Sequence, residues 1–168
     1  MKSGLLIVFL FLLPVMGNSQ EIDHNTLNFG LKLEYIPSYG LLPMAELNIP
    51  ISKNYFGRIG YGYTINNYYK IRQLEVSAGR VFKISNKFDI SAALSFQNFK
   101  IKTNDKTNLY PKSENTIENL NFPIEFNYHL NKKFVINAGI AVVPVFQKYE
   151  NKPQWLEWIS FGVKYKFN

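Results

Sequence analysis

The segment at residues 158–167 has the sequence WISFGVKYKF and alternates without interruption between two kinds of residue. Side chains two positions apart lie on the same face of a strand. One face would therefore be apolar and aromatic, with Ile159, Phe161, Val163, Tyr165 and Phe167. The opposite face would carry Trp158, Ser160, Gly162, Lys164 and Lys166. This pattern predicts a strand between an apolar and a polar medium.

The same period of two recurs along the chain. Seven further runs show it, at residues 27–35, 44–51, 58–65, 73–80, 88–101, 120–130 and 134–146. The run at 134–146 is apolar on both faces and is the least regular. In the run at 73–80, Arg80 falls on the apolar face, which predicts either a bulge near Gly79 or a side chain that reaches the interface. Each run is long enough to cross a bilayer as a tilted strand.

The connections between the runs follow a second rhythm. Three are tight polar turns of similar composition, at residues 52–54, 85–87 and 131–133. The connections between them are longer, at residues 37–42, 67–70, 102–118 and 147–155. Short periplasmic turns and longer extracellular loops are typical of outer-membrane barrels. We therefore predict an all-β fold, an eight-stranded antiparallel up-and-down transmembrane β-barrel.

Composition agrees with a barrel in a membrane. Aromatic residues make up 16% of the chain, yet the mean hydropathy is only −0.13, as alternation of apolar and polar residues requires. Residues 1–19 differ from the rest, with Lys2, an apolar run at 5–15, and Gly17 and Ser19 before a cleavage position. They predict a cleaved signal peptide, and residues 20–168 the barrel domain. An uncleaved anchor helix is the alternative.

The strand rhythm and the aromatic C-terminal strand make residues 27–168 similar to the small outer-membrane β-barrels of the OmpA/OmpX type, a porin-family group of the Gram-negative cell envelope. The resemblance implies an outer-membrane location and assembly by the barrel-assembly machinery. It also implies that Phe161, Val163, Tyr165 and Phe167 form the assembly signal. Asn168 departs from the pattern, because the aromatic Phe167 is penultimate.

The face expected to line the lumen carries both signs of charge. Its members are Lys32, Glu34, Glu46, Arg58, Glu75, Asp89, Glu125, Lys164 and Lys166. An unpaired ion in a narrow lumen would cost several kcal/mol, and eight strands leave an interior that side chains about fill. We expect a network of ion pairs that closes the lumen. The alternative is a narrow pore for ions or small solutes, lined by the same charges.

The sequence offers little for catalysis. His24 and His129 are its only histidines, it has no cysteine, and neither histidine falls on an outer loop. We expect no catalytic residues, no metal site, no cofactor and no enzymatic activity. A lipid-modifying enzyme is a weaker alternative. So is a soluble periplasmic barrel of the lipocalin kind, which would turn its apolar face inward.

The aromatic residues predict girdles at both membrane interfaces. On the loop side they are Tyr35, Tyr39, Tyr63, Tyr68, Tyr69, Tyr149, Trp155 and Trp158; on the turn side they are Tyr55, Phe56, Phe88, Tyr128, Phe134, Tyr165 and Phe167. The net charge of +7 would suit nucleic acid, but an exported barrel would not meet it. The expected partners are outer-membrane lipid and lipopolysaccharide, and we expect a monomer with a structural or surface-interaction role.

Overall fold

The computed structural model describes residues 26–36, 40–66, 69–103, 114–145 and 154–167. The signal peptide predicted at residues 1–19 lies outside them. The described chain forms eight strands: β1 Asn28–Ile36, β2 Gly40–Ser52, β3 Tyr55–Ile65, β4 Tyr69–Lys83, β5 Phe88–Thr103, β6 Glu114–His129, β7 Phe134–Val145 and β8 Gln154–Lys166. Within these residues, no helix is long and apolar enough to cross a membrane.

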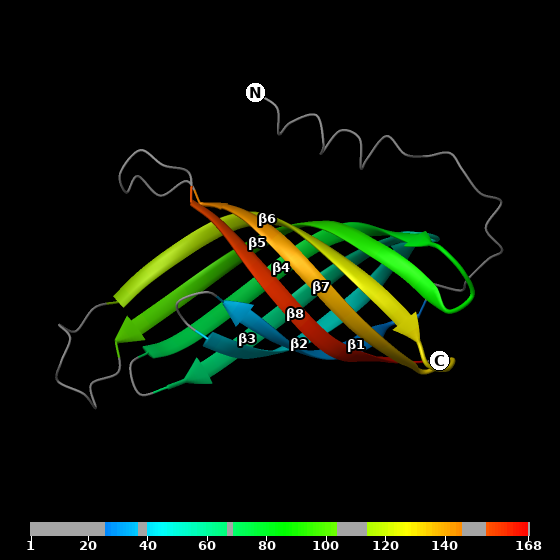
Figure 1. The fold of residues 1–168 in the computed structure, drawn as a ribbon, viewed down its shortest axis with the longest axis horizontal. Coiled ribbons are helices and arrows are strands. Elements are labelled where there is room, and N and C mark those ends of the chain that lie inside the picture. Colours follow the sequence, from blue (N-terminus) through cyan, green and yellow to red (C-terminus); the bar gives the residue numbers. More distant parts are fainter. Residues whose placement is uncertain (1–25, 37–39, 67–68, 104–113, 146–153, 168) are drawn as a thin grey trace, which may run out of the picture.

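The strands close into one antiparallel barrel in chain order, with β8 paired back to β1 (Figure 1). The closing ladder joins Asn28 to Lys166 and Tyr35 to Ile159. Closure pairs the backbone of every strand on both sides, which a lipid environment requires because it offers no water to bond exposed amides. The predicted eight-stranded antiparallel transmembrane barrel is confirmed.

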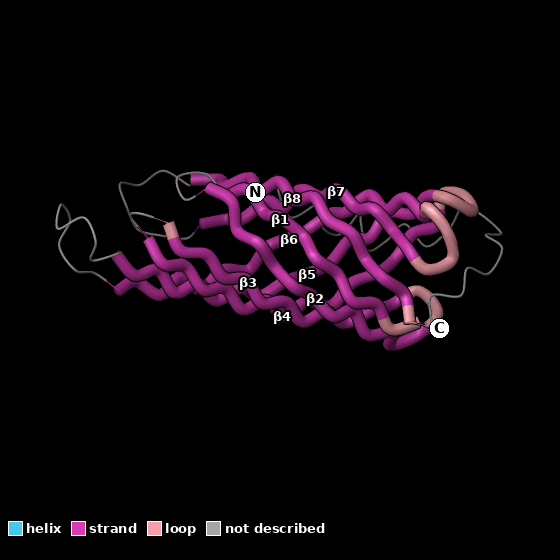
Figure 2. Tube along the Cα trace, turned by 90° about the horizontal axis from the view of Figure 1, so that it is seen from below, coloured by secondary structure: helices cyan, strands magenta, loops and turns pink. Residues whose placement is uncertain are grey.

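The two ends of the barrel differ, but less uniformly than predicted: the connections at residues 104–113 and 146–153 are long, whereas those at 37–39 and 66–68 are no longer than the turns at 84–87 and 130–133. Tight turns join β2 to β3, β4 to β5 and β6 to β7 at the end where β8 also finishes (Figure 2). In two of these turns a side chain caps the bend: Ser85 Oγ accepts from the Phe88 amide (3.1 Å), and Asn131 Oδ1 accepts from the Phe134 amide (2.9 Å). We call this the turn end and the opposite end the loop end.

The loop-end strands are longer than predicted. β5 continues to Thr103 and β6 begins at Glu114, so the predicted loop at residues 102–118 is wrong at both edges. β2 begins at Gly40, β4 at Tyr69 and β8 at Gln154, each inside a predicted connection. Backbone hydrogen bonding between the strands continues beyond the apolar band. The strand residues there are charged, so no apolar alternation marks them in the sequence.

The described side chains of seven strands point to the predicted faces, whereas the run of β7, apolar on both faces, carries no such prediction. Apolar side chains such as Leu31, Val76 and Phe161 are exposed on the outside, whereas Glu75 and Arg58 are buried inside. This orientation contradicts the alternative of a soluble barrel, which would have its apolar face inward. It suits a barrel whose outer face is solvated by lipid.

Arg80 lies on the outer face without a bulge. The β3–β4 and β4–β5 ladders pass Gly79 in regular register, so the predicted bulge is wrong. The Arg80 guanidinium lies over the rings of Tyr55 (5.5 Å) and Phe82 (5.2 Å) near the turn end. A cation stacked on interfacial rings is the second predicted arrangement.

Candidate functional site: the lumen of the barrel

The centre of the lumen holds seven of the nine predicted charged residues. We call them the ion-pair layer: Lys32, Glu34, Glu46, Arg58, Glu75, Glu125 and Lys164. They come from β1, β2, β3, β4, β6 and β8, so the layer crosses the barrel instead of following one strand. Each is less than 9% exposed. The alternating period of the strands points all seven inward, and barrel closure brings them together.

Arg58 and Glu125 form the strongest pair of this layer. Arg58 Nη1 donates to Glu125 Oε1 (2.5 Å) and Arg58 Nη2 donates to Glu125 Oε2 (2.7 Å). The pair is bidentate, which matches the planar fork of a guanidinium to a carboxylate. Lys164 Nζ donates to the same carboxylate at 2.7 Å, and Arg58 Nε donates to Asn48 Oδ1 at 2.8 Å. Glu125 is therefore held by two cations.

Lys32 is the second centre of the layer. Its Nζ lies 2.9 Å from Glu34 Oε1, 3.3 Å from Glu46 Oε2 and 3.3 Å from Glu75 Oε2. The amide of Gln73 donates to Glu34 at 3.2 Å, and thereby supplies a further donor. Glu46 also lies 3.7 Å from Arg58 Nε and so joins the two centres. Three cations and four carboxylates are thus joined in one network of ion pairs.

A second layer, which is apolar, lies between the ion-pair layer and the loop end. Its buried members are Ile36, Leu42, Met44, Ile71, Phe99, Ile101, Ala141 and Trp158. Phe99 and Trp158 meet edge to face with ring centroids 5.0 Å apart. A cavity of about 10 Å³ lies between the two layers, beside Glu75, Gln97 and Trp158.

The alternating runs did not predict this apolar layer. Trp158 is 3% exposed and faces the lumen, so its predicted place on the polar face of the last run is right and its predicted place in the loop-side girdle is wrong. The sequence pattern that indicates the layer is the spacing of its members from inward polar residues. Ile36 follows Glu34, Ile71 precedes Gln73 and Phe99 follows Gln97, each by two positions. Residues two apart share a face, so extending each run would have placed them inside.

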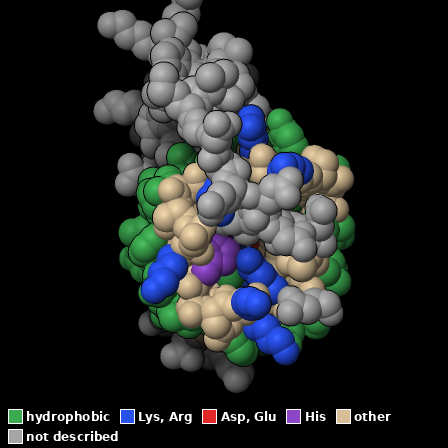
Figure 3. All heavy atoms as spheres, turned by 90° about the vertical axis from the view of Figure 1, so that its right-hand side faces the viewer, with side chains coloured by type: hydrophobic (Ala, Val, Ile, Leu, Met, Phe, Trp, Pro, Cys, Tyr) green, Lys and Arg blue, Asp and Glu red, His purple; other side chains and the backbone are tan. Residues whose placement is uncertain are grey.

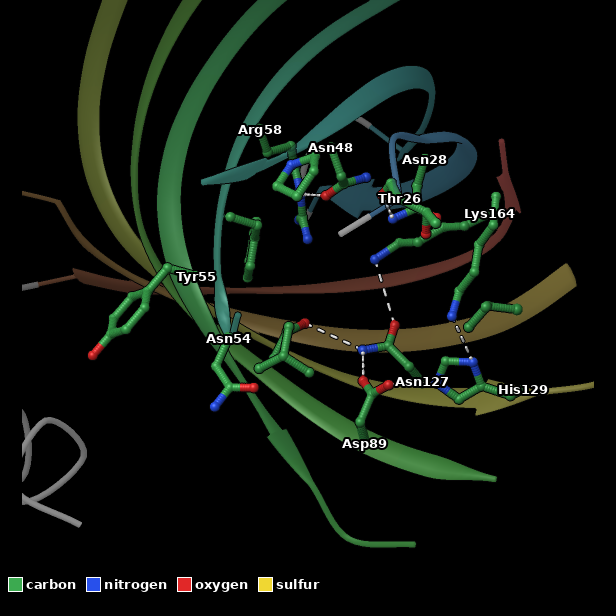
Figure 4. Close-up of a pocket in the computed structure, with 16 residues that line it drawn as sticks. Thr26, Asn28, Asn48, Asn54, Tyr55, Arg58, Asp89, Asn127, His129 and Lys164 are labelled. Atoms are coloured by element: carbon green, nitrogen blue, oxygen red, sulfur yellow. Dashed lines mark hydrogen bonds and ion pairs between the residues drawn. The ribbon is translucent and has the colours of Figure 1, made fainter. Parts of the chain in front are cut away.

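The other two predicted charges, Asp89 and Lys166, lie at the turn end, and Asp89 is linked to Lys164 of the ion-pair layer through the amide of Asn127. There Asp89 contacts His129 Nε2, and Lys166 Nζ lies 3.1 Å from His129 Nδ1. Asn127 Nδ2 donates to Asp89 Oδ1 at 2.6 Å (Figure 4). His129, which is not predicted to belong to any site, lies in a chain of polar contacts between Asp89 and Lys166.

These residues line a pocket of about 70 Å³ that opens at the turn end. Figure 3 shows this end, where Lys and Arg side chains surround a histidine in the mouth of the lumen. At its inner end the pocket is lined by Arg58 and Lys164, which form the edge of the ion-pair layer that faces the turn end. Among the described residues, no three His, Cys, Asp or Glu side chains are grouped to hold a metal. The pocket is a shallow vestibule.

Glycines make room for the long charged side chains. A Cβ at Gly162 would lie 2.6 Å from the Leu31 carbonyl and 2.8 Å from Lys32 Cβ. A Cβ at Gly30 would lie 2.8 Å from Glu46 Cγ, and one at Gly139 would lie 2.9 Å from Glu125 Cγ. The ion-pair layer therefore depends on three inward positions that lack a side chain.

The predicted girdles are partly correct. Tyr35, Tyr63, Tyr55, Phe88, Phe134 and Phe167 are exposed on the outer face. Phe56 instead faces the lumen at 8% exposure, and Tyr69 packs against the apolar layer, so both assignments are wrong. Tyr39, Tyr68 and Tyr149 lie outside the described residues, as does the side chain of Trp155.

The four residues of the predicted assembly signal share the outer face of β8. Phe161, Val163 and Phe167 are exposed there. Tyr165 packs between Phe134 (5.3 Å between ring centroids) and Phe167 (5.2 Å). The Phe167 amide donates to the Leu27 carbonyl at 2.9 Å, which continues the ladder that closes the barrel. The last aromatic therefore lies at the seam between the first and last strands.

Comparison with known proteins gives a likeness in structure alone. No family model matches the chain, and no curated protein matches it. Among solved structures, the N-terminal β-barrel domain of Pseudomonas aeruginosa OprF has a TM-score of 0.62 at 14% identity, over 85% of this chain and 98% of that one. Neisserial surface protein A has a TM-score of 0.59 at 14% identity, over 84% and 95%.

A de novo designed transmembrane β-barrel is similar too, with a TM-score of 0.61 at 16% identity, over 88% of this chain and all of the design. Such likenesses at low identity establish architecture, since one fold serves many functions. The architecture was predicted from the alternating runs. The chain has the fold of the small eight-stranded outer-membrane β-barrels.

Proposed function

We propose that this protein is an exported outer-membrane barrel whose lumen is closed and whose role is structural or one of surface interaction. The observation that carries the proposal is that two layers of different chemistry, one of ion pairs and one apolar, lie one above the other in the lumen. The ion-pair layer joins Arg58, Lys32 and Lys164 to carboxylates across the barrel, and the apolar layer packs Phe99 against Trp158 above it.

Two closures of different chemistry oppose permeation in different ways. A hydrated ion that entered from the turn end would have to displace Lys164 or Arg58 from Glu125, contacts of 2.7 Å and 2.5 Å. It would then meet the apolar layer, where it would lose its hydration without gaining a ligand. A pore for solutes would need both layers to open, so the narrow-pore alternative is less favoured.

The outer surface supports the rest of the proposal. The apolar outer face suits lipid, and the aromatic strand β8 suits recognition by the barrel-assembly machinery. With the signal peptide at residues 1–19, both termini would face the periplasm and the longer loops would face outward. One of the structural neighbours is by name a surface protein, Neisserial surface protein A. The interacting part of this chain would then be its loop end, working as a monomer without a cofactor.

Conductance in planar lipid bilayers tests the closed lumen. The native barrel is compared with Arg58→Ala, Trp158→Ala and the double variant, each first checked for folding by its mobility on gels with and without boiling. We expect no steady conductance from the native protein and little from either single variant, because one layer still blocks. The double variant should give discrete steps.

Stable single-channel steps from the native protein would refute the closed lumen and make the chain a small diffusion channel. Outer-membrane location is tested separately, by fractionating cells that express the full chain. Recovery in the soluble fraction without a heat-dependent mobility shift would contradict the membrane part of the proposal, whatever the conductance.

A further inference from the structure

Four basic residues lie on the outer wall of the barrel, at the loop end, where the proposed function places the outer leaflet. We call them the rim cluster: Lys70 and Arg72 on β4, and Lys100 and Lys102 on β5. They line a hollow of about 210 Å³ together with Glu114 of β6. Their strands are among the longest in the barrel, and in Figure 1 β5 and β6 project at the loop end.

The rim cluster begins directly above the apolar band. Arg72 is the next outward residue after Leu74 on β4, and Leu74 is 50% exposed. On β5, Lys100 follows Phe96 by two outward positions. The outward apolar band of a membrane barrel ends where the hydrocarbon ends. The cations therefore lie at the depth of the lipid headgroups, on the wall that faces lipid.

The cluster sets like charges opposite each other. The register pairs Lys70 with Lys102 and Arg72 with Lys100, on the same face of adjacent strands. Like charges directly across an antiparallel pair are destabilising. Among the residues that the structure describes, Lys102 forms a salt bridge with Glu114 at 2.7 Å, with both side chains about half exposed. Glu118 of β6 also lies on the outer face, diagonal to Lys100, and accepts a hydrogen bond from Asn98 at 3.2 Å. Two carboxylates therefore face four cations, and the cross-strand pairs keep an excess of positive charge.

Tyr63 helps to hold this arrangement. The Lys70 ammonium lies 5.9 Å from the Tyr63 ring centroid, and Tyr63 is itself on the outer face. An aromatic ring under a cation restrains its stem at the interface and leaves its donors directed outward. Arg72, next to it, can donate two hydrogen bonds to one phosphate. The hollow thus combines a bidentate donor with compact ammonium groups.

We propose that the rim cluster binds the phosphate groups of an anionic lipid of the outer leaflet, such as bisphosphorylated lipid A. This inference rests on the proposed membrane location and goes beyond the closed lumen. A lipid phosphate lies at the depth of the cluster, carries the charge that the like pairs lack, and brings acyl chains to the apolar band below. A soluble polyanion would match the charge alone.

The test measures retention of a defined lipid by the whole barrel. The purified, delipidated chain is reconstituted in phosphatidylcholine nanodiscs that contain bisphosphorylated lipid A, and bound lipid is counted by native mass spectrometry. The variant Arg72→Gln with Lys100→Gln removes one cross-strand pair. The control, Lys87→Gln with Lys132→Gln, removes the same charge at the turn end. Heat-dependent mobility checks that each is folded.

We expect the rim variant to retain lipid A about thirtyfold more weakly than the native barrel, from about 1 kcal/mol per basic residue at a charged membrane surface. The control should bind as the native barrel does, and lipid A stripped of phosphate should not be retained. Equal retention by the rim variant and the native barrel would overturn the proposal, as would equal retention of the phosphate-free lipid.

A second arm uses sucrose octasulfate, a soluble polyanion, in nanodiscs without lipid A. Binding of this sugar through Arg72 and Lys100 by a barrel that does not retain lipid A would also overturn the proposal, and would assign the cluster to soluble polyanions. None of these results depends on conductance, so failure here is distinguishable from failure of the closed lumen.

Discussion

The Arg58 guanidinium and the Glu125 carboxylate form a bidentate pair across the lumen, at 2.5 and 2.7 Å, although 67 residues separate them in sequence. They come from β3 and β6, which are not neighbours in the barrel. The pair therefore links two walls that backbone hydrogen bonds do not connect directly. It fixes the distance across the barrel at the level of the ion-pair layer.

Replacing Arg58 with Ala should reduce the free energy of unfolding by about 3–5 kcal/mol, because it leaves Glu125 and Glu46 buried with too few cations. The measurement is urea unfolding of the barrel in lipid vesicles. The matched control is Lys102→Ala, which breaks a pair whose side chains are each 51% exposed. That change should cost no more than about 1 kcal/mol. Similar losses for the two variants would contradict the buried network.

Replacing Gly162 with Ala should destabilise the barrel by about 1–3 kcal/mol, the usual cost of overpacking. Its new methyl group would lie 2.6 Å from the Leu31 carbonyl oxygen, and that carbonyl cannot move away because its strand is held by backbone pairing. Gly57→Ala is the control, since its Cβ would find its nearest neighbour at 3.6 Å. The same unfolding experiment compares them. An unchanged Gly162→Ala barrel would show that β1 and β8 can separate at this level.

Replacing Phe99 with Ala should cost about 3–5 kcal/mol, because it empties the centre of the apolar layer and removes the ring that meets Trp158. Phe96→Ala removes the same side chain three positions away on β5, where the ring is 45% exposed on the outer face. Lipid can fill that space, so the loss there should be smaller. Equal losses in thermal unfolding would argue against a packed layer inside.

Replacing Phe167 with Ser should reduce the amount of folded barrel in the membrane. The change removes the last aromatic of the proposed assembly signal, next to the seam where the Phe167 amide bonds the Leu27 carbonyl. Quantitative blotting of heat-sensitive barrel in membrane fractions measures the effect. Ile159→Ser, on the same outer face, is the control. Normal levels of folded Phe167→Ser protein would show that assembly does not use this residue.

Epitope tags should reveal the orientation of the barrel. A tag at Asn131, in a turn where its side chain caps the Phe134 amide, is expected in the periplasm. A tag at Asn108, outside the described residues, is expected at the cell surface. Antibody labelling of intact and permeabilised cells distinguishes them. Surface labelling of the Asn131 tag alone would invert the topology and move the rim cluster to the inner leaflet.

Much of the architecture follows from local sequence. Alternation with period two indicates the inward and outward face of every run except that at residues 134–146, because a one-residue change of register would turn every side chain to the other face. The tight turns at residues 52–54, 85–87 and 131–133 separated the two ends. Strand ends at the loop side were harder to place, since β5 and β6 continue through charged residues where no apolar period marks them.

The partners of the inward residues could not be predicted from sequence. Period two shows that Lys32, Arg58 and Asp89 face inward, but not how far each lies along the axis. That position depends on how the tilted strands are staggered around the whole barrel. The stagger separates Asp89 from the ion-pair layer and places it with His129, and it brings Lys70 opposite Lys102 on the outer wall. The sequence alone determined which way most strand side chains point, with Phe56 and Tyr69 as exceptions, because that direction is a property of one strand. The closed tertiary structure decided which side chains meet, because that depends on the register of all eight.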